Sequence, residues 1–174
     1  MKNEKNIIIR KATLEDVDEI YDLLADVHYS MPEEVRSWHS YTKNKERYSL
    51  FINDGYCFVA CDKDKIIGAY LTYVLRDDGT EFYQMVKDYF KDATNIIEVI
   101  NVVVKDGYRG LGLMNKMILK SEELLKDSKY HRFVTTVHPD NKYSLDNMVK
   151  NGFKTVITTK LYGGRDRCIL VKTM

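Results

Sequence analysis

The sequence predicts an α/β layered domain, of the α+β kind, that spans residues 1–174 as a single unit. Short β-branched or apolar runs alternate along the chain with segments whose apolar residues recur at helical spacing. A length of 174 residues suits one domain with a sizeable core. Apolar residues make up 44% of the chain and charged residues 30%, which is ordinary for a globular protein. No repeat or linker interrupts the pattern.

The N-terminal half is expected to contain a strand, a helix and then a pair of strands. The first strand is the β-branched run Ile7–Arg10. Thr13 is the N-cap of a helix, because apolar residues recur at helical spacing from Leu14 to Val27. Residues 28–53 are irregular, with room for one further helix. The two strands that follow, joined by a short polar turn, are Tyr56–Asp62 and Ile66–Leu75.

The C-terminal half is expected to alternate strands with helices and to end in a hairpin. Helical spacing predicts a short helix in Phe82–Phe90 and a longer one in Met114–Leu125. The run Ile96–Val104 is nearly all apolar and β-branched, which predicts a central strand buried on both faces. The remaining elements are a strand, a helix ended by a glycine, and two hairpin strands: Phe133–Val137, Asn141–Lys150, Phe153–Leu161 and Cys168–Lys172.

Composition limits the classes of partner. A net charge of +1 gives no basic field for nucleic acid, and no apolar run reaches the roughly 18 residues that a membrane span needs. The N-terminus, Met1–Lys5, lacks the apolar core of a signal peptide. The three cysteines, Cys57, Cys61 and Cys168, suit a reducing compartment and have no further ligands at metal-site spacing. We therefore expect a cytoplasmic protein that binds no metal, nucleic acid or membrane.

The stretch VKDGYRGLGLMNKM, Val104–Met117, places two glycines and an arginine between a strand and a helix. A helix N-terminus has unpaired N–H groups and a partial positive charge, and glycines let an anion approach them. The Walker pattern is absent, and Asn115 stands where a dinucleotide-binding fingerprint needs its third glycine. We expect Arg109 and this loop to bind a phosphate-containing ligand. The alternatives are a plain connection and a solvated surface arginine.

Arg109–Met114 resembles the R/Q-x-x-G-x-G/A motif of the GNAT superfamily of acyl-CoA-dependent N-acetyltransferases. The preceding Val104–Tyr108 is similar to that family's V-x-P-x-Y approach, with Asp106 in place of the proline. Asn141–Ser144, followed by Gly152 and Phe153, resembles the later N-x-x-A … G-F segment. The order of elements matches as well, so the resemblance covers most of the chain.

The resemblance implies a central mixed, mostly antiparallel sheet, flanked by helices, in which the fourth and fifth strands splay apart. It also implies that acetyl-CoA is the cosubstrate and lies in this splay. Backbone groups of Val102 and Val104 would pair with its pantetheine, and Asn141 would face it, although Asn141 also suits an N-cap. The diphosphate would be held by the loop residues Arg109, Gly110, Leu111, Gly112, Met114 and Asn115.

Two positions depart from the family pattern. Met114 replaces the final small residue of the loop, and Met148 occupies the place where many members carry a tyrosine. A thioether cannot donate a proton, so a general acid is not supplied from position 148. The nearest replacements in the sequence are His138 and Tyr143, for which packing and surface exposure are the alternative roles.

Glu98 is our candidate for the general base that neutralises the acceptor ammonium, directly or through water. An amine with a pKa near 10.4 is only about one part in a thousand neutral at pH 7.4, so a base helps substantially. Glu98 is the only charged residue in the apolar strand Ile96–Val104, and burial would raise its pKa. The alternative is a strand-edge glutamate that reaches solvent.

The sequence gives the least information about which residues bind the acceptor amine. The resemblance places acceptor contacts in residues 28–48, where Trp38, His39 and Tyr41 would form an aromatic wall or simply pack against helices. The role of the insertion 77–94 is open. We therefore expect an N-acetyltransferase that acts on a primary amine of a small molecule or peptide, by direct attack on the thioester. The alternatives are a non-catalytic acyl-CoA sensor and a nucleotide-binding domain. A homodimer is left open.

Overall fold

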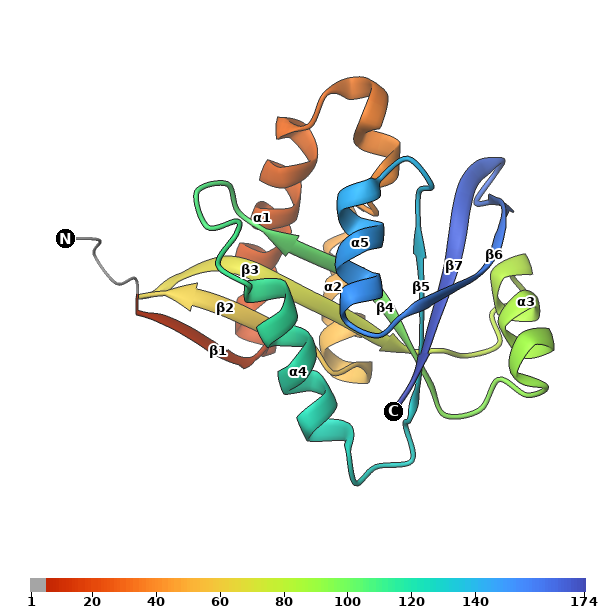
Figure 1. Ribbon diagram of the computed structural model, residues 1–174. Helices are drawn as coiled ribbons and strands as arrows, with labels where there is room; N and C mark the ends of the chain where they lie inside the picture. Colours follow the sequence, from red (N-terminus) through yellow and green to blue (C-terminus); the bar gives the residue numbers. More distant parts are fainter. Residues whose placement is uncertain (1–5) are drawn as a thin grey trace.

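The computed structural model describes residues 6–174, which form a seven-stranded sheet with helices on both faces (Figure 1). The expectation that Met1–Lys5 lack the apolar core of a signal peptide concerns residues outside this range. The strands are β1 (Ile7–Lys11), β2 (Phe58–Asp62), β3 (Lys65–Val74), β4 (Ile96–Val104), β5 (Arg132–Val137), β6 (Lys154–Leu161) and β7 (Arg165–Thr173). Their order is β1-β2-β3-β4-β5-β7-β6, with only the β4–β5 pair parallel. The mixed, mostly antiparallel sheet expected from the sequence is confirmed.

Helices cover the sheet on both sides. The α-helices are α1 (Val17–Ser30), α2 (Lys45–Asp54), α3 (Glu81–Phe90), α4 (Leu113–Leu125) and α5 (Lys142–Lys150), and the 3-10 helices are η1 (Leu14–Asp16) and η2 (Glu33–Trp38). Figure 1 shows α4 and α5 in front of the sheet, α1 and α2 behind it, and α3 beside β6. The region that is irregular in the sequence, 28–53, contains η2 and α2. Only three residues of α2 are buried, Tyr48, Phe51 and Ile52, so its helical pattern is weak.

Three clusters of buried side chains make up the core. One lies under α4 and α5 and includes Met117 and Phe153, and a second lies under α1 and α2 and includes Leu24. The third joins Phe82 of α3 to Val134 of β5 and to the hairpin strands. Because α3 belongs to the insertion 77–94, that insertion is a packing element that covers one end of the sheet. All three cysteines are free and buried.

β4 changes its geometry in the middle. Opposite β3, Asn101 pairs with Leu71 and Val99 pairs with Thr72, so Ile100 is left over as a β-bulge. On the other side, β4 pairs with β5 only from Ile96 to Val99. The two parallel strands therefore separate at the bulge, as the resemblance implied.

The bulge decides which peptide groups face the gap between β4 and β5. The N–H of Lys105 donates to the carbonyl of Ile67 on β3 at 2.8 Å. Since successive residues of a strand turn their peptide groups to opposite edges, those of Val102 and Val104 point away from β3 and into the gap. The side chains of these two valines pack against the cluster under α4 and α5. Main-chain N–H and C=O groups of β4 therefore line one side of the gap.

A buried threonine hydroxyl lies at the last pair of residues before β4 and β5 separate. The Thr135 hydroxyl on β5 donates to the carbonyl of Val99 at 2.8 Å. Replacing Thr135 by Val keeps the shape of the side chain but removes this donor. We expect Thr135→Val to lower the free energy of unfolding by about 1 kcal/mol, measured from urea titrations.

The exposed Thr155 on β6 provides the matched control. Thr155→Val makes the same chemical change where no hydrogen bond of the hydroxyl is found among residues 6–174, and it should leave the urea midpoint nearly unchanged. Equal midpoints for the two variants would show that the Thr135–Val99 bond does not stabilise the end of the paired region.

Candidate functional site

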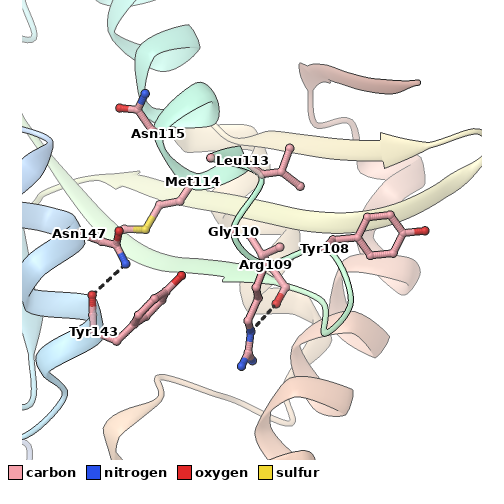
Figure 2. A pocket seen from close by; sticks show the side chains of 10 residues that line it. Tyr108, Arg109, Gly110, Leu113, Met114, Asn115, Tyr143 and Asn147 are labelled. Atoms are coloured by element: carbon pink, nitrogen blue, oxygen red, sulfur yellow. Dashed lines mark hydrogen bonds between the residues drawn. The ribbon is translucent and has the colours of Figure 1, made fainter. Parts of the chain in front are cut away.

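A pocket of about 230 Å³ opens where the chain leaves β4 and enters α4. Figure 2 shows that the glycine loop and the first turn of α4 form one side of it and α5 forms the other. Its lining residues are Val104, Tyr108, Arg109, Gly110, Gly112, Leu113, Met114, Asn115, Tyr143 and Asn147. Most of the loop residues singled out in the sequence therefore meet here. Val102, Leu111 and Asn141 are not part of the lining.

The N-terminus of α4 differs from those of three other α-helices. Asn44, Thr80 and Asn141 each cap their helix by accepting a backbone N–H, whereas the N-cap of α4 is Gly112, which has no side chain for this task. The first turn of α4 also contains no acidic residue. Its N–H groups and the positive end of its dipole are therefore available to an anion at the pocket.

The two glycines of the loop leave room for that anion. Gly110 and Gly112 have φ values of 80° and 68°, in the left-handed region that favours glycine. A Cβ added at either position would meet no described atom within 4 Å. Unpaired N–H groups, open backbone and a nearby arginine together suit a diphosphate, so the residues present fit the diphosphate of a coenzyme A.

Arg109 is held at the pocket by its own loop. Its guanidinium forms an ion pair with Asp106 at 3.0 Å, and its Nε donates to the carbonyl of Val104 at 3.4 Å. The Arg109 side chain is 50% exposed and that of Asp106 is 72% exposed. Asp106, which stands in place of the family's proline, therefore competes with a bound anion for this arginine.

The α5 side of the pocket adds one residue that the sequence analysis missed. Tyr143 is 68% exposed and lines the pocket together with Asn147, whose side-chain amide donates to the carbonyl of Tyr143 at 2.9 Å. Spacing of four residues on one helix face was the signal that could have found Asn147. Asn141 acts as the N-cap of α5, since its side chain accepts the N–H of Ser144 at 3.1 Å.

Met148 is only 2% exposed and belongs to the core cluster under α4 and α5. The backbone N–H of Phe153 donates to its carbonyl at 3.1 Å, which helps to end α5. Position 148 therefore supplies an apolar side chain to the core and no proton donor to the site.

Glu98 lies on β4 just before the strands separate, paired with Tyr73 on β3 and Val134 on β5. Burial raises the pKa of its carboxyl from 4.5 to about 7, and the negative charge of Asp78 acts in the same direction. Arg47 of α2 opposes this rise. Among residues 6–174, the Glu98 carboxylate forms no ion pair. A carboxyl with a pKa near 7 would suit general-base catalysis at neutral pH.

The three aromatic candidates do not form one wall. Trp38 stacks on His138 at the end of β5, with ring centroids 5.1 Å apart. Tyr41 stacks instead on His28 of α1 at 4.7 Å, and His39 lies 5.9 Å from the same histidine. Burial lowers the pKa of His39 to about 4, so this ring stays neutral at pH 7. Of the three aromatic candidates, only Trp38 lies at the end of β5.

The segment between α1 and α2 is tied to the sheet at two points. The side-chain amide of Asn101 on β4 donates to the carbonyl of Ser40 at 2.6 Å. The guanidinium of Arg167 on β7 donates to the carbonyl of Ser37 at 2.7 Å. Residues 37–40 therefore bridge β4 and β7 across the region where β4 and β5 separate.

Two further classes of site were considered in the described part of the chain. None of the helices in residues 6–174 is long and apolar enough to cross a bilayer. The same residues contain no group of three or more His, Cys, Asp or Glu side chains that could hold a metal ion.

The ion pair between Asp106 and Arg109 yields a test of anion binding. Asp106→Asn releases Arg109 and removes a negative charge from the pocket, so we expect coenzyme A to bind about 3-fold more tightly in titration calorimetry. Arg109→Met should weaken binding by about 10-fold.

Combining the two changes tests whether Asp106 acts through Arg109. The gain from Asp106→Asn should shrink when Arg109 is already Met. Asp127→Asn, which changes the net charge equally at an exposed site, is the control and should leave affinity unchanged. An Asp106→Asn variant that binds coenzyme A no better than this control would contradict the competition.

Comparison with known proteins agrees with the fold and identifies the family. The model of the acetyltransferase (GNAT) family matches residues 17–153. Comparison with curated protein sequences finds no significant match. Among solved structures, PaiA N-acetyltransferase from Thermoplasma acidophilum in complex with coenzyme A is 20% identical with a TM-score of 0.70, covering 97% of this chain and 99% of that one.

Two other solved structures are similar over nearly their whole length. Ribosomal-protein-alanine N-acetyltransferase from Brucella melitensis is 19% identical with a TM-score of 0.71, covering 96% of this chain and 99% of that one. YncA, a putative acetyltransferase from Salmonella typhimurium with acetyl-CoA, is 16% identical with a TM-score of 0.71, covering 97% of this chain and 94% of that one. At these identities the structures show a shared fold. Because the family model matches most of its length, this chain belongs to the GNAT family of acetyltransferases.

Proposed function

We propose that this protein transfers the acetyl group of acetyl-CoA to a primary amine of a small molecule or peptide. The observation that carries the proposal is the pocket at the uncapped N-terminus of α4, which lies next to the free edge of β4. This arrangement provides donors for a diphosphate and, beside them, main-chain groups for an extended amide-containing chain. Its family membership supports the same reaction.

The cosubstrate would use both parts of this surface. Arg109 to Asn115 contribute the loop and helix amides for the diphosphate. Val102 and Val104 contribute the peptide groups that face the gap and can pair with the pantetheine amides. Tyr143 and Asn147 form the opposite wall. Asn141 would act indirectly, by fixing the first turn of α5.

Glu98 would act as the general base on the other face of β4. Its carboxylate takes a proton from the acceptor ammonium, directly or through water, and the neutral nitrogen then attacks the thioester carbonyl. As the new C–N bond forms, negative charge develops on the carbonyl oxygen, which the N–H of Val102 can stabilise. The C–S bond then breaks, the thiolate leaves, and the nitrogen releases its second proton to solvent to give the neutral amide.

His138 and Tyr143 are the candidates for returning a proton to the thiolate. The Nδ1 atom of His138 accepts the N–H of Asp140 at 3.1 Å, which leaves the proton of the neutral imidazole on Nε2. Trp38 holds this ring by stacking. Tyr143 reaches the pocket from α5. Trp38 also provides a flat surface for the acceptor, whereas His39 and Tyr41 contribute through the packed cluster around His28.

The proposed base gives a pH-dependent prediction. Glu98 must be ionised to accept a proton, so kcat/KM should rise as the pH increases through about 7. Glu98→Gln should lower kcat/KM by about 100-fold and remove the bend near pH 7, leaving only the rise due to the amine itself. The measurement is the pH profile of thiol release.

Glu15→Gln, at an exposed position on η1, is the control and should keep the wild-type profile. A Glu98→Gln variant with unchanged turnover and the same pH profile would remove Glu98 from the mechanism.

The function itself is tested by thermal unfolding and by thiol release with a panel of amines. Acetyl-CoA should raise the unfolding temperature, and at least one amine should cause thiol release. Stabilisation by acetyl-CoA with no release across the panel would indicate a non-catalytic sensor. Stabilisation by ATP or NAD instead would indicate a nucleotide-binding domain.

A further inference from the structure

Arg167 on β7 is a buried cation that forms no ion pair with any carboxylate of residues 6–174. The residue is only 5% exposed. Its two hydrogen bonds go to backbone carbonyls, those of Asp166 at 2.9 Å and Ser37 at 2.7 Å. A guanidinium has five N–H donors, so three donors of Arg167 are not accounted for. Burial lowers the pKa of Arg167, and the charge of Asp166, whose carboxylate pairs with Lys160, offsets this only in part. A bound anion would stabilise the guanidinium further.

Glu98 and Arg167 lie on the same face of the sheet. Ile96 of β4, Val134 of β5 and Ile169 of β7 all belong to the core cluster under α3. Because side chains alternate along a strand, Glu98 and Arg167, each two residues from a member of that cluster, turn to this same face. It is the face opposite the glycine-loop pocket.

Tyr162 lies beside Arg167 and is affected by the charge of Glu98. The Arg167 guanidinium is 6.0 Å from the centre of the Tyr162 ring. The Tyr162 hydroxyl is 3.5 Å from that of Thr136 on β5, and its pKa is raised by burial and also by the charge of Glu98. Tyr162 and Thr136 thus add two hydroxyl groups to this part of the molecule, near the guanidinium on β7.

The two charges are not paired with each other, although they share this face. A carboxylate on one strand and a guanidinium two strands away instead match a ligand with a positive and a negative end. The acceptor amine, which arrives as an ammonium, supplies the positive end at Glu98. The planar guanidinium of Arg167, which can donate two parallel N–H bonds, suits a carboxylate at the negative end.

We infer that the acceptor is a small amine that also carries a carboxylate, and that Arg167 binds this carboxylate while Glu98 receives the amine. The inference rests on the proposed acetyl transfer. The carboxylate and the amine must be separated by several bonds, because Glu98 and Arg167 lie on strands with β5 between them. Arg167 is thus a specificity residue, and its bond to Ser37 places the bridge of residues 37–40 beside the acceptor.

The test compares acids with matched amides. The probes are ω-amino acids from glycine to 6-aminohexanoate and the primary amide of each, assayed by acetyl-CoA-dependent thiol release. At the best chain length, kcat/KM of the acid should exceed that of the amide by about 30-fold. Amides that are acetylated as well as their acids would overturn the inference.

Arg167→Met separates substrate binding from a purely structural role. Both substrates should lose activity because the bond to Ser37 is removed, but kcat/KM for the acid should fall about 30-fold further than that for the amide, mainly through KM. Equal losses for acid and amide would overturn the inference, because they would show that Arg167 only anchors residues 37–40. Arg165→Met, two residues earlier on the same strand and exposed, should change neither value.

Two further measurements distinguish a failure of this inference from a failure of the proposed function. If Arg167→Met does not fold, as judged by its unfolding temperature, the comparison of acid with amide in the wild type decides alone. Failure of the wild type to bind acetyl-CoA would overturn the proposed function itself. Binding of acetyl-CoA without acetylation of any acid, and without stabilisation of the complex by the acids, would overturn only the inference about Arg167.

Discussion

The separation of β4 from β5 after Val99 is the constraint on which the rest of the site depends. A strand in the middle of a sheet normally has partners for its peptide groups on both edges, and a buried group without one costs roughly 1–3 kcal/mol. The bulge at Ile100 turns the peptide groups of Val102 and Val104 toward a gap instead of a neighbouring strand. Within residues 6–174 the fold therefore keeps, at its centre, an edge of β4 that has no neighbouring strand beyond Val99, next to the uncapped N-terminus of α4. One ligand that carries amides and a diphosphate would satisfy both features, as we propose for acetyl-CoA.

β4 also divides the site into two sides. Val102 and Val104 pack toward α4 and α5, where the glycine loop and Tyr143 form the pocket. Glu98 lies on the other face, with Arg167 and the bridge of residues 37–40. A thioester held at the gap is open to an amine from this second side. Because the bulge lies between Glu98 and Val102, one irregular residue sets the relative positions of the proposed base and the proposed cosubstrate contact.

Much of the fold and of the candidate site could be predicted from the sequence. The features that could not be predicted were missed for physical reasons. Apolar periodicity predicted β4 and α4, and the glycines at 110 and 112 predicted the loop, because left-handed backbone restricts residue choice strongly. α2 gave a weak signal, since only three of its ten residues are buried. Arg167 was missed because its proposed role depends on its burial, which is a tertiary property. The separation of Trp38 from His39 and Tyr41 likewise follows from packing on different elements.

The most direct test of the central claim is amide hydrogen exchange of β4, followed residue by residue by NMR. The N–H groups of Val102 and Val104 face the gap, whereas that of Val103 faces β3, so the three form an internal comparison. Saturating coenzyme A should slow exchange at Val102 and Val104 by about 10-fold or more and change Val103 much less. Protection confined to the loop and α4, with no difference between Val102 and Val103, would show that the ligand does not use the free edge of β4.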